Sequence, residues 1–81
     1  MTVHVRLFAS ARELAGFDAR SLELATGDTV ERVWHFLESI NPLFHQWKKS
    51  TRVAVNLEYA TNSTPLKDGD EVAVIPPVSG G

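Results

Sequence analysis

The 81-residue chain contains no cysteine. Disulfides, thiolate metal sites and cysteine nucleophiles are therefore excluded, so any sulfur or acyl chemistry must use another group of the chain. Long apolar runs are also missing: no stretch approaches the roughly 20 apolar residues of a membrane helix, and the first residues alternate in polarity. From these absences we expect a cytoplasmic protein without a membrane span or a secretion signal.

Charge clusters and catalytic residue sets are also missing. Eight basic and ten acidic residues give a net charge of −2, and Lys48-Lys49 is the only adjacent basic pair. This balance argues against a general nucleic-acid binder and against a polybasic membrane patch. The three histidines lack metal-ligand spacing, and no Ser/His/Asp set, carboxylate pair or phosphate-binding glycine loop is recognisable. We therefore expect no metal site and no catalysis by the chain alone.

The length and the hydrophobic fraction of 43% suit one small domain over residues 1–81. Alternating apolar residues predict strands over 2–10 and 21–24. Between them, residues 11–15 have the composition of a helical turn, which Gly16 closes. The first part of the chain is therefore expected to form a strand, a short helical turn and a second strand.

One long amphipathic helix is predicted over residues 30–40. Its apolar residues recur at the i, i+3, i+4, i+7 spacing of one helical face: Val30, Val33, Trp34 and Leu37. Asp28 and Glu31 match a capping box at its start. The helix is expected to stop at Asn41, because the residue before Pro42 is pushed out of the α region.

Residues 42–47 are too few for a second long helix, so we expect a turn or loop there, with Leu43, Phe44 or Trp47 against the core. Further strands are predicted over residues 52–56, 59–60 and 71–75. This order of elements predicts an α+β protein with the β-grasp, or ubiquitin-like, fold, in which one main helix covers a mixed sheet. In that fold the first and last strands lie side by side at the centre.

The chain ends in a stiff segment that carries a bare carboxylate. After the last strand, Pro76 and Pro77 lack the backbone N–H that a sheet needs and favour an extended chain. The last four residues are Val78, Ser79, Gly80 and Gly81. Two terminal glycines make a tail one backbone wide that can thread a narrow channel. Its carboxylate reacts only after activation, for example as an adenylate; the alternative is a free end that happens to finish in Gly-Gly.

Four motifs carry a family resemblance. They are Leu66-Lys67-Asp68-Gly69-Asp70-Glu71-Val72-Ala73; Pro76-Pro77-Val78-Ser79-Gly80-Gly81; Leu7-Phe8-Ala9 with Arg12-Glu13-Leu14 and Gly16; and Val53-Ala54-Val55-Asn56. In these motifs the chain resembles the MoaD/ThiS family of sulfur carriers, in particular the small subunits of molybdopterin synthase. The resemblance spans almost the whole chain, but residues 42–50 lie outside it.

This resemblance implies a sulfur-donating subunit that is not itself the catalyst. Gly81 would be adenylated by an E1-like, MoeB-like partner that uses ATP, and then converted to a thiocarboxylate with sulfur from a donor protein. The tail would next enter a MoaE-like large subunit and pass its sulfur to cyclic pyranopterin monophosphate, in molybdenum cofactor biosynthesis. The family assembles as a heterotetramer with two copies of each subunit. No permanently bound cofactor is implied.

The same resemblance directs attention to the base of the tail. Phe8 is an aromatic residue on the polar face of its strand, and Ile75 has the corresponding position on the last strand. If the two strands are neighbours, Phe8 and Ile75, with Tyr59 beside them, form an apolar docking patch for the large subunit and the activating enzyme. The alternative is a set of scattered surface residues. Arg12 is a candidate for an ion pair at the rim, or a solvated charge at a helix end.

The tail residues Pro76, Pro77, Val78 and Ser79 complete the predicted partner-binding set. Three other functions remain open. The chain could carry sulfur for thiazole formation in thiamin synthesis, although that group usually lacks the Pro-Pro-Val stem. It could be a ubiquitin-like modifier that is attached to lysines through Gly81. It could also be a plain β-grasp interaction domain, for which Gly81 is dispensable.

Overall fold

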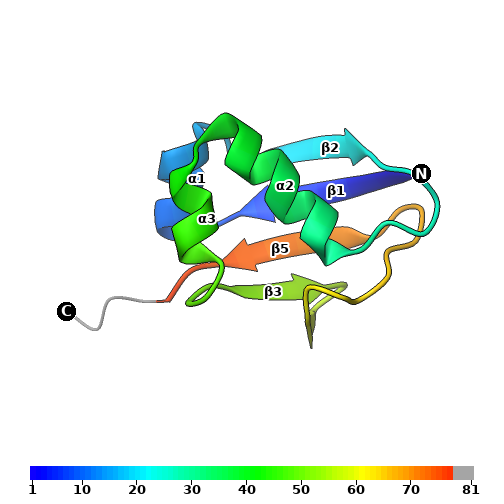
Figure 1. Ribbon diagram of the computed structural model, residues 1–81. Coiled ribbons are helices and arrows are strands. Elements are labelled where there is room, and N and C mark those ends of the chain that lie inside the picture. The colour runs from blue at the N-terminus through cyan, green and yellow to red at the C-terminus, as the bar shows by residue number, and fades with distance from the viewer. Residues whose placement is uncertain (78–81) are drawn as a thin grey trace.

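The computed structural model describes residues 1–77, which form a mixed five-stranded sheet with helices on one face (Figure 1). The elements are β1 (Thr2–Leu7), α1 (Ala9–Ala15), β2 (Ala19–Glu23), α2 (Val30–Ile40), α3 (Leu43–Trp47), β3 (Arg52–Val55), β4 (Glu58–Ala60) and β5 (Glu71–Ile75). Val78, Ser79, Gly80 and Gly81 lie outside the described residues. No helix among residues 1–77 has the length and hydrophobicity that crossing a membrane requires.

The strands lie in the order β2-β1-β5-β3-β4. β1 and β5 are parallel neighbours with Leu7 opposite Val74, and β3 pairs antiparallel with the other edge of β5. The first and last strands are therefore adjacent at the centre, as the sequence predicts. A turn at Gly69, with φ +86°, holds the start of β5 beside β1, because its N–H donates to the carbonyl of Thr2 at 2.7 Å.

The core lies between the sheet and α2. Its principal members alternate along β1 and β5 and recur on one face of α2: Val3, Val5, Leu7, Val72, Val74, Val30, Val33, Trp34 and Leu37, all at most 2% exposed. Full burial of one aliphatic side chain of this size contributes about 1.5–3 kcal/mol to folding. Apolar residues repeat every two positions in the strands and every 3.6 positions in the helix, and these repeats predict this core correctly.

Two boundary predictions near β1 and α2 are wrong. β1 ends at Leu7 and not at residue 10, because Ala9 has φ +48° and the longer helix α1 begins there. At the start of α2 the capping box is absent: Thr29 is the N-cap and makes no side-chain capping bond. The Asp28 carboxylate instead accepts a hydrogen bond from the N–H of Ala25 at 2.9 Å.

The turn or loop expected at 42–47 is a short helix, α3. Pro42 has φ −58°, which suits the start of a helix, and the side chain of Asn41 accepts a hydrogen bond from the N–H of Leu43 at 3.0 Å. Phe44 is completely buried, with its ring centroid 6.5 Å from Trp34 and 5.7 Å from Trp47. Tertiary packing of one aromatic residue therefore stabilises a helix that is too short to be stable alone.

Substitution of Phe44 tests this account of α3. We expect Phe44→Ala to lower the free energy of unfolding by about 3–5 kcal/mol, because it empties a closed aromatic site. Its neighbour Leu43 is 46% exposed, so Leu43→Ala is the matched control and should cost less than about 0.5 kcal/mol. Urea unfolding of both variants measures the difference, and equal losses would contradict the assignment of Phe44 as the anchor.

Candidate functional site at the base of the tail

The tail starts from the most enclosed strand of the sheet. β5 is paired on both sides, and its pairing with β3 ends where Ile75 lies opposite Arg52. Pro76 is buried and Pro77 is exposed, and neither offers an N–H for further pairing. Figure 1 shows the chain leaving the sheet at the end where α1 and α3 also lie. The base of the tail therefore has a fixed position relative to the body of the domain.

The face of the sheet opposite α2 carries the predicted docking residues. Phe8 follows Leu7 as Ile75 follows Val74 in the parallel pair, so Phe8 and Ile75 lie at the same level of the sheet. Tyr59 lies on β4, two strands from Ile75 on β5. It opposes Ala54, which opposes Ala73, so it is level with Ala73, two residues before Ile75. Phe8 is 41% exposed and Tyr59 69% exposed, whereas Ile75 is half-buried.

Two arginines join these aromatic residues on the same face. The Cζ atom of Arg6 lies 5.6 Å from the ring centroid of Phe8, and that of Arg52 lies 4.9 Å from the ring centroid of Tyr59. Such stacking fixes guanidinium groups over aromatic faces at a gain of about 0.5–1 kcal/mol each at exposed sites. We call this surface the open-face patch and define it as Arg6, Phe8, Arg52, Ala54, Tyr59, Ala73 and Ile75.

The composition of the open-face patch resembles that of a protein interface. Aromatic residues and arginine are enriched in interfaces, whereas the two alanines between them are buried. The sequence alone did not single out Arg6 or Arg52 as site residues. The available signal was parity: Arg6 precedes Phe8 by two positions, and therefore shares its face.

Arg12, the predicted rim residue, lies on α1, which packs beside β5. Its side chain is exposed and makes no ion pair within residues 1–77. Residues of α1 thus bring a free guanidinium group to the end of the molecule from which the tail departs. This position is compatible with an ion pair to a partner.

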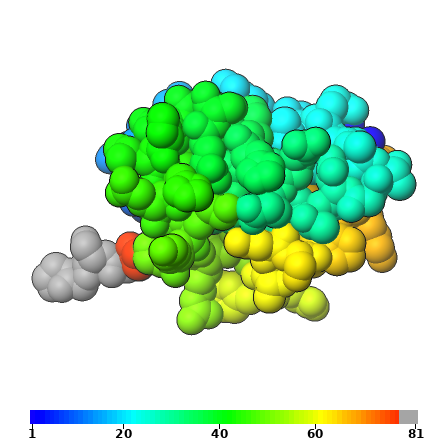
Figure 2. Space-filling model, viewed as in Figure 1, coloured from blue at the N-terminus to red at the C-terminus, as the bar shows by residue number. Residues whose placement is uncertain are grey.

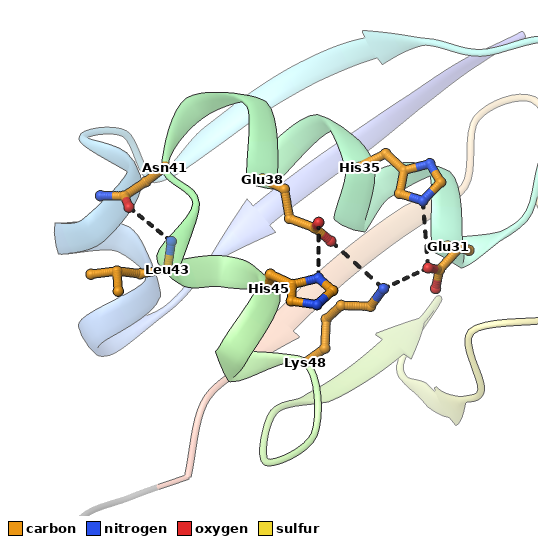
Figure 3. A network of polar contacts seen from close by, with 7 residues as sticks. All are labelled: Glu31, His35, Glu38, Asn41, Leu43, His45 and Lys48. Carbon is orange, nitrogen blue, oxygen red and sulfur yellow. Dashed lines mark hydrogen bonds and ion pairs between the residues drawn. The ribbon is translucent and has the colours of Figure 1, made fainter.

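A polar network fixes α3 beside the base of the tail (Figure 3). The amine of Lys48 lies 2.5 Å from Oε1 of Glu31 and 3.6 Å from Oε2 of Glu38. The imidazole of His35 lies 3.5 Å from Glu31, and that of His45 lies 3.2 Å from Glu38. These contacts join α2 to the end of α3. Because the Lys48 side chain is only 16% exposed, solvent screens its ion pairs less than those of a fully exposed lysine.

The hydrogen bond from Lys48 to Glu31 raises the pKa of Lys48 above its ordinary value of 10.5. Attraction by the carboxylates of Glu31 and Glu38 adds to this rise, and partial burial opposes it. Within residues 1–77, no group of three His, Asp or Glu side chains that could hold a metal ion includes either histidine of the network. The network is therefore an ionic connection between two helices.

Comparison with known proteins identifies relatives over the full length. The ThiS family matches residues 5–81. The molybdopterin synthase sulfur carrier subunit of Chlamydomonas reinhardtii is 39% identical over 83 residues, which cover 100% of both chains. The protein of the same description from Arabidopsis thaliana is 37% identical and covers 98% of this chain and 82% of its own length.

Solved structures agree with this relationship. SAMP1, the small archaeal modifier protein 1 of Haloferax volcanii, has a TM-score of 0.87 and 27% identity, with 100% of both chains covered. A chain from the complex of subunits 1 and 2 of the Helicobacter pylori molybdopterin-converting factor has a TM-score of 0.71 and 27% identity, again with both chains covered completely. A ubiquitin from Caldiarchaeum subterraneum, with 20% identity and a TM-score of 0.65, shares the fold. The predicted β-grasp fold is confirmed.

The titration of Lys48 provides a test of the network. A raised pKa in the folded protein means that charged Lys48 stabilises the fold below pH 10.5 and that this contribution is lost as the pH rises through the higher folded-state value. We expect Lys48→Met to lower stability at neutral pH by on the order of 1 kcal/mol. The variant should also lose less stability than the unsubstituted protein between about pH 9 and pH 11.5.

Exposed Lys49 is the matched control. Lys49→Met removes the same charge next to Lys48 and should preserve the alkaline loss. Urea unfolding midpoints at the two pH values provide the measurement. If Lys48→Met and Lys49→Met respond identically to alkali, the Lys48 network does not contribute as described.

Proposed function

The chain belongs to the ThiS family, and from this premise we propose that it is the sulfur carrier subunit of a molybdopterin synthase, with Gly81 as the carrier residue. The observation that carries the proposal is similarity over the entire chain, 39% identity with full coverage, to a protein of that description. A matching region that extends to residue 81 includes the Gly-Gly ending. We place this activity in the cytoplasm.

The proposed chemistry begins with activation of the terminal carboxylate. An oxygen of the Gly81 carboxylate attacks the α-phosphorus of ATP in an E1-like enzyme, and pyrophosphate leaves. Hydrosulfide released by a donor protein then attacks the acyl carbon and displaces AMP, which produces the thiocarboxylate and a proton. ATP belongs to the activating enzyme. This chain contributes a tail without side chains at Gly80 and Gly81, which fits a narrow channel.

In the second step the tail enters a large subunit, where the thiocarboxylate sulfur is transferred to cyclic pyranopterin monophosphate. A dithiolene contains two sulfur atoms, so two charged carriers are consumed for each product. Support for this partner comes from the Helicobacter pylori relative, whose structure is a complex of subunits 1 and 2. We propose the open-face patch as the surface that docks on this partner, with Arg12 at its rim.

A second candidate function is protein modification through Gly81. The likeness to small archaeal modifier protein 1 favours it, since that structure has the highest TM-score of those described above, 0.87. The two functions share activation of the terminal carboxylate and diverge afterwards. After sulfur transfer, the Gly81 terminus of a carrier is a free carboxylate again. The Gly81 terminus of a modifier ends in an amide bond to a lysine of another protein.

Intact mass after incubation with an E1-like enzyme, ATP and a sulfur source tests the proposal. We expect the mass increase that corresponds to replacement of one carboxyl oxygen by sulfur. A chain that lacks Gly81 is the control and should remain unchanged. Addition of the large subunit and the precursor should then yield molybdopterin. Absence of thiocarboxylate, under conditions that convert a known sulfur carrier subunit, contradicts the proposal; amide products with lysines would favour the modifier.

The docking role of the open-face patch is tested by Phe8→Ala. Loss of a central aromatic contact should weaken binding to the large subunit by about tenfold or more, while the melting temperature changes little because Phe8 is 41% exposed. Ile40 is 36% exposed and lies on α2, on the other side of the sheet, so Ile40→Ala is the control and should bind normally. Isothermal titration calorimetry measures both affinities. Unchanged affinity of Phe8→Ala would exclude this residue from the interface.

A further inference from the structure

A hollow of about 230 Å³ lies beside the base of the tail, on the side of the sheet that α3 covers. It is lined by Ser10, Trp47, Ser50, Thr51, Pro76 and Pro77. Figure 2 shows the start of the tail, in red, against the green segment that follows α3. The open-face patch lies on the opposite face of the same sheet. The base of the tail is therefore flanked by two surface features, one on each face.

The lining of the hollow combines three ring-bearing residues, Trp47, Pro76 and Pro77, with the hydroxyl-bearing Ser10, Ser50 and Thr51. Trp47 rests edge-to-face on buried Phe44, with 5.7 Å between ring centroids. The next residue, Lys48, is fixed to α2 by the carboxylate of Glu31 at 2.5 Å (Figure 3). The facing wall consists of Pro76 and Pro77, whose rings have restricted backbones. A site of this kind loses little conformational entropy when it is occupied.

The size of the hollow limits what it can hold. Pockets for cofactors and drug-sized molecules usually measure about 300–1,000 Å³, which is larger than this hollow. A cavity of roughly 150 Å³ is sufficient for a benzene molecule. The hollow therefore suits one ring-bearing side chain, beside the exposed lining residues Ser10 and Ser50.

The position of the hollow identifies the source of that side chain. Any protein that encloses the tail beyond exposed Pro77 must also contact the surface around it. We propose that the hollow receives an aromatic or proline side chain of the large subunit, which thereby contacts the tail base on both faces of the sheet. This inference rests on the proposed function.

Filling the hollow tests the inference. Ser10 is exposed on α1, and Ser10→Leu places an apolar side chain in the space without removing a core residue. We expect it to weaken binding to the large subunit by about tenfold or more, with an unchanged melting temperature and an unchanged rate of thiocarboxylate formation by the activating enzyme. Ser50→Leu fills the same space from the segment after α3 and should have the same effect.

Ser63→Leu is the matched control, because Ser63 is also exposed but does not line the hollow; it should bind normally. Normal binding by both Ser10→Leu and Ser50→Leu overturns the inference while the proposed function stands. Equal loss of large-subunit binding and of thiocarboxylate formation in these variants also overturns it, because the substitutions then impair the tail for both partners and not the binding of the large subunit alone. If the unsubstituted protein forms thiocarboxylate but does not bind the large subunit, both the inference and the proposed function fail.

Discussion

The parallel pairing of β1 with β5 is the constraint on which the rest of the structure depends. It places the first and last strands side by side at the centre of the sheet, and β3 pairs with the other side of β5. A slip of one residue would move Val72 and Val74 out of the core and bring Ala73 in. Burial therefore fixes the register of β5, and with it the point at which the tail leaves the domain.

This constraint gives the two faces of the tail base different characters. On the open face, the central positions are the small residues Ala54 and Ala73, with exposed aromatic and guanidinium groups around them. On the helical face, α3 adds Trp47 as a wall beside the prolines. Both surfaces are attached to the same rigid strand, so a partner that contacts them also determines the direction in which the tail enters.

Periodicity predicted the parts of the fold whose signal lies within one element. The α2 face and the alternation of β1 and β5 are of this kind. The central position of the first and last strands followed from the inferred fold and not from periodicity. α3 was missed because five residues hold too little periodicity, and its stability depends on Phe44 packing against Trp34 and on Lys48 reaching Glu31, 17 residues earlier. The capping box failed because Asp28 bonds backward to Ala25.

The candidate site was predictable to the same extent. Strand parity placed Phe8 and Ile75 at one level, but the position of Tyr59 depends on its pairing with Ala54, which has no signal in either strand alone. The function of the tail also depends in part on residues that no single element of the sequence reveals. Activation of a terminal glycine is chemistry that a sulfur carrier and a modifier share, so a tail sequence does not separate them. Recognition at the base of the tail has to make that distinction, and it depends on residues that only the folded chain brings together.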